Sequence, residues 1–150
     1  MFISQISVFL ENKAGALREM TALLGQGGVD LLALSLADTQ SFGIVRLIVH
    51  SGQIDEAMRL LKDGGYVARI NHVICAAVPD RPMGLSELLG VIEEANLSVE
   101  YMYSFMRASK AGTANMILRL NDGAKAAQVF ALKDVVMLSQ DDVDALGAAN

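Results

Sequence analysis

The chain repeats one order of strands and helices after an interval of 68 residues, which becomes 69 beyond the turn at 107–112. Asn12 and Asp80 are 68 positions apart, and Leu17 and Leu85 keep the same separation. In each copy an apolar strand ends in a polar turn, a helix begins near a glycine, and another strand follows at once. Few residues are identical between the copies, so what repeats is the order of the elements. A period of this kind indicates duplication of one supersecondary unit.

Each copy is predicted to contain four strands and two helices. In the first copy, apolar residues recur at intervals of three and four through both predicted helices, and glycines end each helix. The expected first-copy strands are 2–10, 29–37, 44–49 and 66–70, with helices at 15–26 and 53–63. The expected second-copy strands are 72–78, 97–106, 113–120 and 135–138, with helices at 85–95 and 123–133. The order βαββαβ is that of the split βαβ or ferredoxin-like unit.

The predicted fold class is therefore α+β, with two ferredoxin-like units in tandem. We expect antiparallel sheets with helices packed on one face of each sheet. The expected domains are residues 1–70 and 71–150, the second ending in a short helix with Ser139 as N-cap. Because Ile70 and Val73 are nearly contiguous, the sheets must lie close together. A side-by-side pair sharing one extended sheet is the economical arrangement, and strand exchange between the copies is the alternative.

The apolar composition bears on assembly and location. Hydrophobic residues make up 53% of the chain and the mean hydropathy is +0.38, more than two small units bury easily alone. We therefore expect the units to share a core or to pair with another copy, and we predict a homodimer. No apolar stretch is long enough for a membrane helix, and no basic segment precedes Phe2 and Ile3. The expected location is cytoplasmic, with no membrane partner.

Charge and the rarest residues argue against several functions. The net charge is −5, the basic residues are scattered along the sequence and aromatics are only 5%, so no nucleic-acid partner is expected. The single cysteine, Cys75, lies in an apolar strand and is predicted to be a small buried hydrophobe. His50 and His72 have no carboxylate at metal-site spacing, and no nucleophile or phosphate-loop motif occurs. We expect no catalytic residue, no metal, no cofactor and no enzyme activity.

The first strand–helix turn has the composition of a small-molecule site. Free backbone N–H groups and the positive end of a helix dipole form a seat for a carboxylate, and Gly15 permits close approach. Asn12 adds a side-chain amide, and the carboxylate of Asp30 is able to accept a hydrogen bond from an ammonium group. With apolar walls, this is the outline of an α-amino-acid site. The alternative is purely structural, with Asn12 capping the helix and Asp30 capping a turn.

Residues 11–31 resemble the opening of an ACT domain. They consist of Glu-Asn-Lys-Ala-Gly-Ala-Leu, a predicted helix, and then Gly-Val-Asp-Leu. The resemblance extends over residues 1–70 and 72–138, so the chain resembles a tandem ACT protein. It implies that amino acids or similar effectors bind at interfaces between paired units, where the helix-start loop of one unit faces the second strand of its partner. The implied first-copy positions are Asn12, Ala14, Gly15, Ala16, Leu17, Asp30 and Leu31.

The second copy departs from this pattern at its helix start. Met83 occupies the position of Gly15, where its side chain either fills or reshapes the pocket, and Gly84 is displaced by one residue. The corresponding second-copy positions are Asp80, Met83, Gly84, Leu85 and Ser98. We expect the first loop to be the main binding site.

These observations lead to two functional hypotheses. The first is an amino-acid-binding regulatory protein that acts in trans on a metabolic enzyme or works as a sensor. The alternative is a regulatory subunit of an amino-acid biosynthetic enzyme such as acetolactate synthase, whose small subunit begins with a segment similar to residues 7–17. That subunit's second half does not repeat the strand–Asp-Arg-Pro–helix opening found at 73–85, which favours the first hypothesis.

Overall fold

The computed structural model describes residues 1–38, 41–107 and 111–148. The sequence also predicts turns at 38–43 and 107–112, which include residues 39–40 and 108–110 that lie outside the described residues. The strands are β1 (Ile3–Glu11), β2 (Leu31–Asp38), β3 (Phe42–Val49), β4 (Ala68–Pro79), β5 (Val99–Ser104), β6 (Thr113–Leu120) and β7 (Val136–Met137). The helices are α1 (Ala16–Gln26), α2 (Ile54–Asp63), α3 (Gly84–Glu94), α4 (Gly123–Leu132) and α5 (Gln140–Ala148), with a 3-10 turn at Ser51–Gln53. The predicted α+β order is confirmed.

The strands form one antiparallel sheet shared by both units. Its order is β2-β3-β1-β4-β6-β5, and β7 also pairs with β4. The first half of β4 pairs with β1 from Ala68 to Val73, and its second half pairs with β6 from Ile74 to Pro79. The expected strands 66–70 and 72–78 are thus one strand, which closes the first unit and opens the second. The expected division at residues 70 and 71 falls inside it and remains a prediction.

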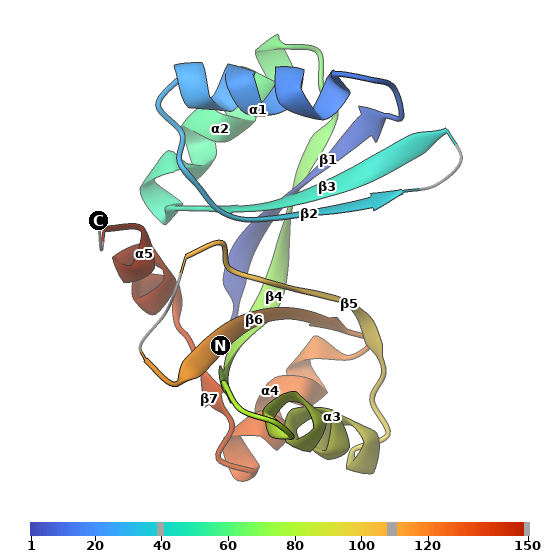
Figure 1. Cartoon of the computed structure of the whole chain (residues 1–150), viewed down its shortest axis with the longest axis vertical. Coiled ribbons are helices and arrows are strands. Elements are labelled where there is room, and N and C mark those ends of the chain that lie inside the picture. The colour runs from blue at the N-terminus through green and yellow to red at the C-terminus, as the bar shows by residue number, and fades with distance from the viewer. Residues whose placement is uncertain (39–40, 108–110, 149–150) are drawn as a thin grey trace.

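The helices cover the two outer sides of this arrangement. Figure 1 shows α1 and α2 at one end, α3 and α4 at the other, and the strands between them. The period of two along β1 explains the layers, because Ile6 and Val8 face the helices while Ile3 and Gln5 face the other unit. In each unit the sheet therefore has helices on one face, as the sequence predicts, and its other face packs against the other unit.

A buried cluster joins the two units, so they share a core. Its members are apolar side chains from β1, β2, β3, β4, β6 and α5, namely Ile3, Leu32, Ala33, Ile48, Val73, Cys75, Ile117 and Val143. Ala33 of β2 forms an antiparallel bridge with Phe105, and the Met106 N–H donates to the Leu32 carbonyl at 2.9 Å. These contacts bury part of the apolar surplus seen in the sequence.

Helix α5 ties the end of the chain to the first unit. The predicted cap is confirmed, since the Ser139 hydroxyl accepts from the Asp142 N–H at 3.1 Å and the Asp142 carboxylate accepts from the Ser139 N–H at 2.8 Å. The Asp144 carboxylate accepts from the Ser51 N–H at 2.8 Å. None of the helices in the described residues is long and apolar enough to cross a membrane.

Candidate functional site

The first helix-start loop leaves its backbone open to approach from outside. Gly15 precedes α1 with φ of 84°, in the left-handed region that favours glycine. A Cβ built on Gly15 would meet no atom within 4 Å. Asn12 is exposed, and its N–H donates to the Ser41 carbonyl at 3.2 Å. The loop is therefore held by its own backbone, and the start of α1 remains accessible.

Beside this loop lies a cavity of about 340 Å³, which we call the first helix-start pocket. Its apolar lining is Phe9, Leu10, Ala16, Phe42, Tyr66 and Val67, and its charged lining is Glu11, Lys13 and Glu19. The Lys13 ammonium lies 3.4 Å from the Glu11 carboxylate. Burial and the charge of Glu19 raise the pKa of Tyr66, while Lys13 opposes the shift. The pocket therefore combines charged groups of both signs with an apolar lining.

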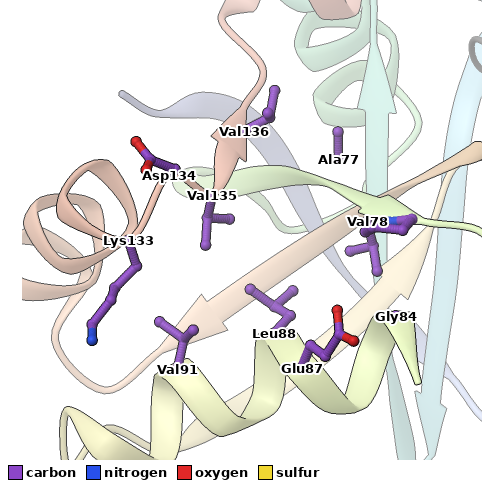
Figure 2. Close-up of a pocket in the computed structure, with 11 residues that line it drawn as sticks. Ala77, Val78, Gly84, Glu87, Leu88, Val91, Lys133, Asp134, Val135 and Val136 are labelled. Atoms are coloured by element: carbon purple, nitrogen blue, oxygen red, sulfur yellow. The ribbon is translucent and has the colours of Figure 1, made fainter.

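The second unit has an equivalent cavity of about 270 Å³, the second helix-start pocket (Figure 2). Gly84 and Val135 line it at the repeat positions of Ala16 and Tyr66. In Figure 2, Leu88 and Val91 of α3 point towards Val135 across an apolar space. Two of its three charged lining residues are held in ion pairs, Glu87 with Arg81 at 2.8 Å and Lys133 with Glu94 at 3.7 Å, and the third is Asp134.

Met83 does not fill the second pocket. Its backbone takes φ of 72°, matching the left-handed conformation of Gly15, and its side chain is 64% exposed. Gly84 is the tightly packed position, because a Cβ there would lie 2.0 Å from the Pro79 carbonyl oxygen. The glycine displaced by one residue therefore lets α3 start directly against the end of β4.

Asp30 lies at the other end of α1 from the first loop. The 11 residues of α1 separate the two by about 16 Å. The Asp30 carboxylate forms a salt bridge with Arg107, which also donates to the Gly147 carbonyl at 3.0 Å. Within one unit, then, the loop and Asp30 do not share a pocket. Asp30 instead connects the start of β2 to the second unit.

The remaining predicted positions divide between surface and core. Ser98 repeats the backbone role of Asp30, since its N–H donates to the Asn121 side chain at 2.9 Å, as that of Asp30 does to Gln53 at 3.1 Å. Leu17 and Leu31 pack against the first core, while Ala14 and Leu85 are exposed. Asp80 lines a separate pocket together with Arg107.

Sequence reasoning missed most of the side chains that make the first pocket. Of the twelve predicted positions, Ala16 lines the first helix-start pocket and Gly84 the second. Tyr66 and Val67 reach the first pocket from the turn before β4. The sequence repeat indicates this turn, because the Gly-Gly pair after α2 and Tyr66 occupy the same place in the first copy as Lys-Asp and Val135 in the second.

The residues with catalytic or metal-binding potential occupy structural positions. Cys75 is fully buried, as predicted. His50 and His72 are exposed, and the His50 ring accepts from the Gly52 N–H at 2.9 Å in the turn before α2. Across the described ranges, no three His, Cys, Asp or Glu side chains gather as a metal site.

Comparison with known proteins identifies the family. Residues 1–146 match the ACT domain pair family. The crystal structure of protein BT0572 from Bacteroides thetaiotaomicron is 34% identical, with 96% of each chain covered and a TM-score of 0.85. The ligand-free regulatory subunit of aspartate kinase from Thermus thermophilus is 13% identical, with 86% of this chain and 90% of that chain covered and a TM-score of 0.60, which shows a shared fold. No curated protein sequence matches. ACT domains are generally ligand-binding regulatory domains, and this chain belongs to the ACT domain pair family.

Proposed function

We propose that this protein binds an amino acid in the first helix-start pocket and regulates a metabolic enzyme in trans. One observation carries the proposal, namely that this pocket lies beside the open start of α1 and combines charges of both signs with an apolar lining. Regulatory ACT units account for nearly the whole chain, since residues 1–146 match the family.

An α-amino acid fits the chemistry of the pocket in one orientation. Its carboxylate is placed at the N-terminus of α1, where free N–H groups, the helix dipole and Lys13 attract an anion. Its ammonium group is placed beside Glu19, which has no ion-pair partner among the described residues. Its side chain then packs on Phe42 and Tyr66.

The first pocket is the better candidate of the two. In the second, Glu87 and Lys133 are engaged with Arg81 and Glu94. A ligand there competes with two ion pairs, whereas the first pocket has one, between Lys13 and Glu11, and its Glu19 forms none among the described residues.

The rim of the first pocket supports the proposal of a homodimer. Phe9 is 48% exposed, Phe42 53% and Val67 59%, and the neighbouring Ile70 is 44% exposed. Exposed apolar groups of this kind mark association surfaces. Sedimentation at micromolar concentration is expected to give twice the 16.0 kDa chain mass, and a monomer would contradict it. Recovery of one stoichiometric enzyme from native extract would instead favour the dedicated regulatory subunit.

The binding proposal is tested by thermal shift and calorimetry with the twenty amino acids. A ligand at 100 times its dissociation constant adds about 2.7 kcal/mol, or roughly 5–10 °C in Tm for a chain of this size. Lys13→Gln and Glu19→Gln are each expected to weaken binding roughly tenfold or more, since each removes a charge-assisted hydrogen bond. Lys125→Gln, an exposed change on α4, is the control. Unchanged affinity in both pocket variants would refute the assignment.

A further inference from the structure

The inner face of the first unit carries two arginines on either side of a serine. In the sheet register, Ser7 of β1 lies opposite Arg46 of β3 on one side and opposite Arg69 of β4 on the other. Opposed residues of antiparallel strands project to the same face, here the face towards the second unit. Because neighbouring strands are about 4.8 Å apart, the two arginine backbones are separated by roughly 10 Å. The small serine leaves the space between them open.

The second unit closes this space into a cavity of about 260 Å³. It contributes Glu100 and Tyr101 from β5 and Arg119 from β6. The Arg46 guanidinium carbon lies over the Tyr101 ring, 3.6 Å from its centre, in a cation–π contact. The Arg119 Nε lies 3.4 Å from the Glu100 carboxylate.

The charges lining this inter-sheet cavity are unbalanced. Three guanidinium groups face one carboxylate, although the chain as a whole carries −5. Within the part of the chain that the structure describes, Arg46 and Arg69 have no carboxylate at salt-bridge distance. The basic residues are scattered along the sequence, but the fold brings three of them, from three strands, to this cavity. Two unneutralised cations beside one another favour the binding of an anion.

A buried hydrogen-bond network holds the inner end of the cavity in place. The Gln5 side-chain amide is fully buried, donates to the Tyr101 hydroxyl at 2.9 Å and accepts from the Tyr103 hydroxyl at 2.6 Å. The Ser7 hydroxyl donates to the Asn71 side chain at 2.5 Å. Since the Tyr101 hydroxyl accepts from Gln5, its own proton is free to be donated to a ligand.

We propose that the inter-sheet cavity binds a small dicarboxylate, with one carboxylate on Arg46 and the other on Arg69. The two cations stand on strands that are not neighbours, so an anion with two separated charged ends matches them better than a single compact oxyanion. Guanidinium groups bind carboxylates through paired N–H donors, which suits both ends. The helix-start pockets share none of these arginines, although Phe9 lines both this cavity and the first helix-start pocket.

Calorimetry with succinate at low salt tests the proposal. Arg69→Gln is expected to weaken succinate binding roughly tenfold to a hundredfold, because a charge-assisted contact is lost. Arg69 is exposed and forms no ion pair among the described residues, so the variant is expected to fold. Arg18→Gln removes the same charge from the exposed face of α1 and is the matched control, expected to bind like the parent.

Three results would overturn the proposal. They are no succinate binding by the parent at millimolar concentration, equal losses in Arg69→Gln and Arg18→Gln, or tighter binding of inorganic phosphate or acetate than of succinate. Lys13→Gln separates this site from the proposed function. It is expected to weaken amino-acid binding and to leave succinate binding unchanged, so either site can fail while the other stands.

Discussion

The buried amide of Gln5 allows a quantitative test of how the two units are held together. Gln5 and Asn115 are the buried polar residues among those described. Gln5 bonds to two tyrosines of the other unit, and burial raises the pKa of Tyr103 above its ordinary value. We consider Gln5→Leu, Tyr103→Phe and the double variant.

The expected free energies follow from which polar groups lose their partners. Gln5→Leu leaves the Tyr103 hydroxyl buried without an acceptor, at about 1–3 kcal/mol, and removes the bond to Tyr101, at about 1 kcal/mol. Tyr103→Phe leaves the side-chain oxygen of Gln5 without its donor and lowers the stability by about 1–2 kcal/mol. The double variant leaves neither partner stranded, so its loss is expected to fall below the sum of the single losses by about 1–2 kcal/mol.

Urea unfolding followed by far-ultraviolet circular dichroism measures all four proteins without relying on tyrosine emission. Equal m-values across the set would show that the same surface is exposed on unfolding. If the single effects add to within about 0.5 kcal/mol, the two side chains are energetically independent, and the reasoning from the hydrogen bond is refuted.

Three further outcomes are expected. Gly84→Ala places a Cβ 2.0 Å from a backbone oxygen and should lower the stability by about 1–3 kcal/mol. Gly90→Ala in the same helix places a Cβ that meets nothing within 4 Å and should raise the stability by about 0.5–1 kcal/mol. Both changes are measured from Tm, and a more stable Gly84→Ala than Gly90→Ala would contradict the packing at Gly84. Burial raises the pKa of Cys75 to about 12, so its thiol should resist maleimide at pH 8 until urea unfolds the chain, and labelling of the native protein would contradict this. Backbone and side-chain hydrogen bonds from Ser139 lower the pKa of Asp142 below 3.8, so the stability that the ionised carboxylate contributes is present above pH 3.8 and is lost as the pH falls through the lower native pKa. Amide hydrogen exchange in α5 should therefore become faster as the pH falls through that range. In Asp142→Asn the exchange should already be faster at higher pH and show no such further rise.

The order of elements is readable from the sequence because its signals are local. Glycines after each first-unit helix and the spacing of apolar residues within each helix are set by neighbours along the chain. The junction at Asn71 and His72 is different. These polar residues suggest a break between two strands, yet Asn71 lies inside β4 and accepts from Ser7 of β1. Continuity there depends on partner strands that are distant in sequence.

The candidate sites are less readable for the same reason. Asp30 has the composition of a ligand acceptor, but Arg107, 77 positions later, binds its carboxylate. The three arginines of the inter-sheet cavity lie on three different strands. One signal was present, since Arg46 interrupts an apolar strand on the same face as Ile48 and must therefore meet polar surroundings or solvent.

Strand β4 gives the molecule no hinge. Its 12 residues extend over about 40 Å, with Val67 of the first helix-start pocket just before one end and Val78 of the second near the other. A ligand that changes the twist of one end acts on a continuous hydrogen-bonded rod, not on a flexible tether. The two pockets are therefore joined by one continuous strand, and separating the repeats at residues 70 and 71 would cut through that strand.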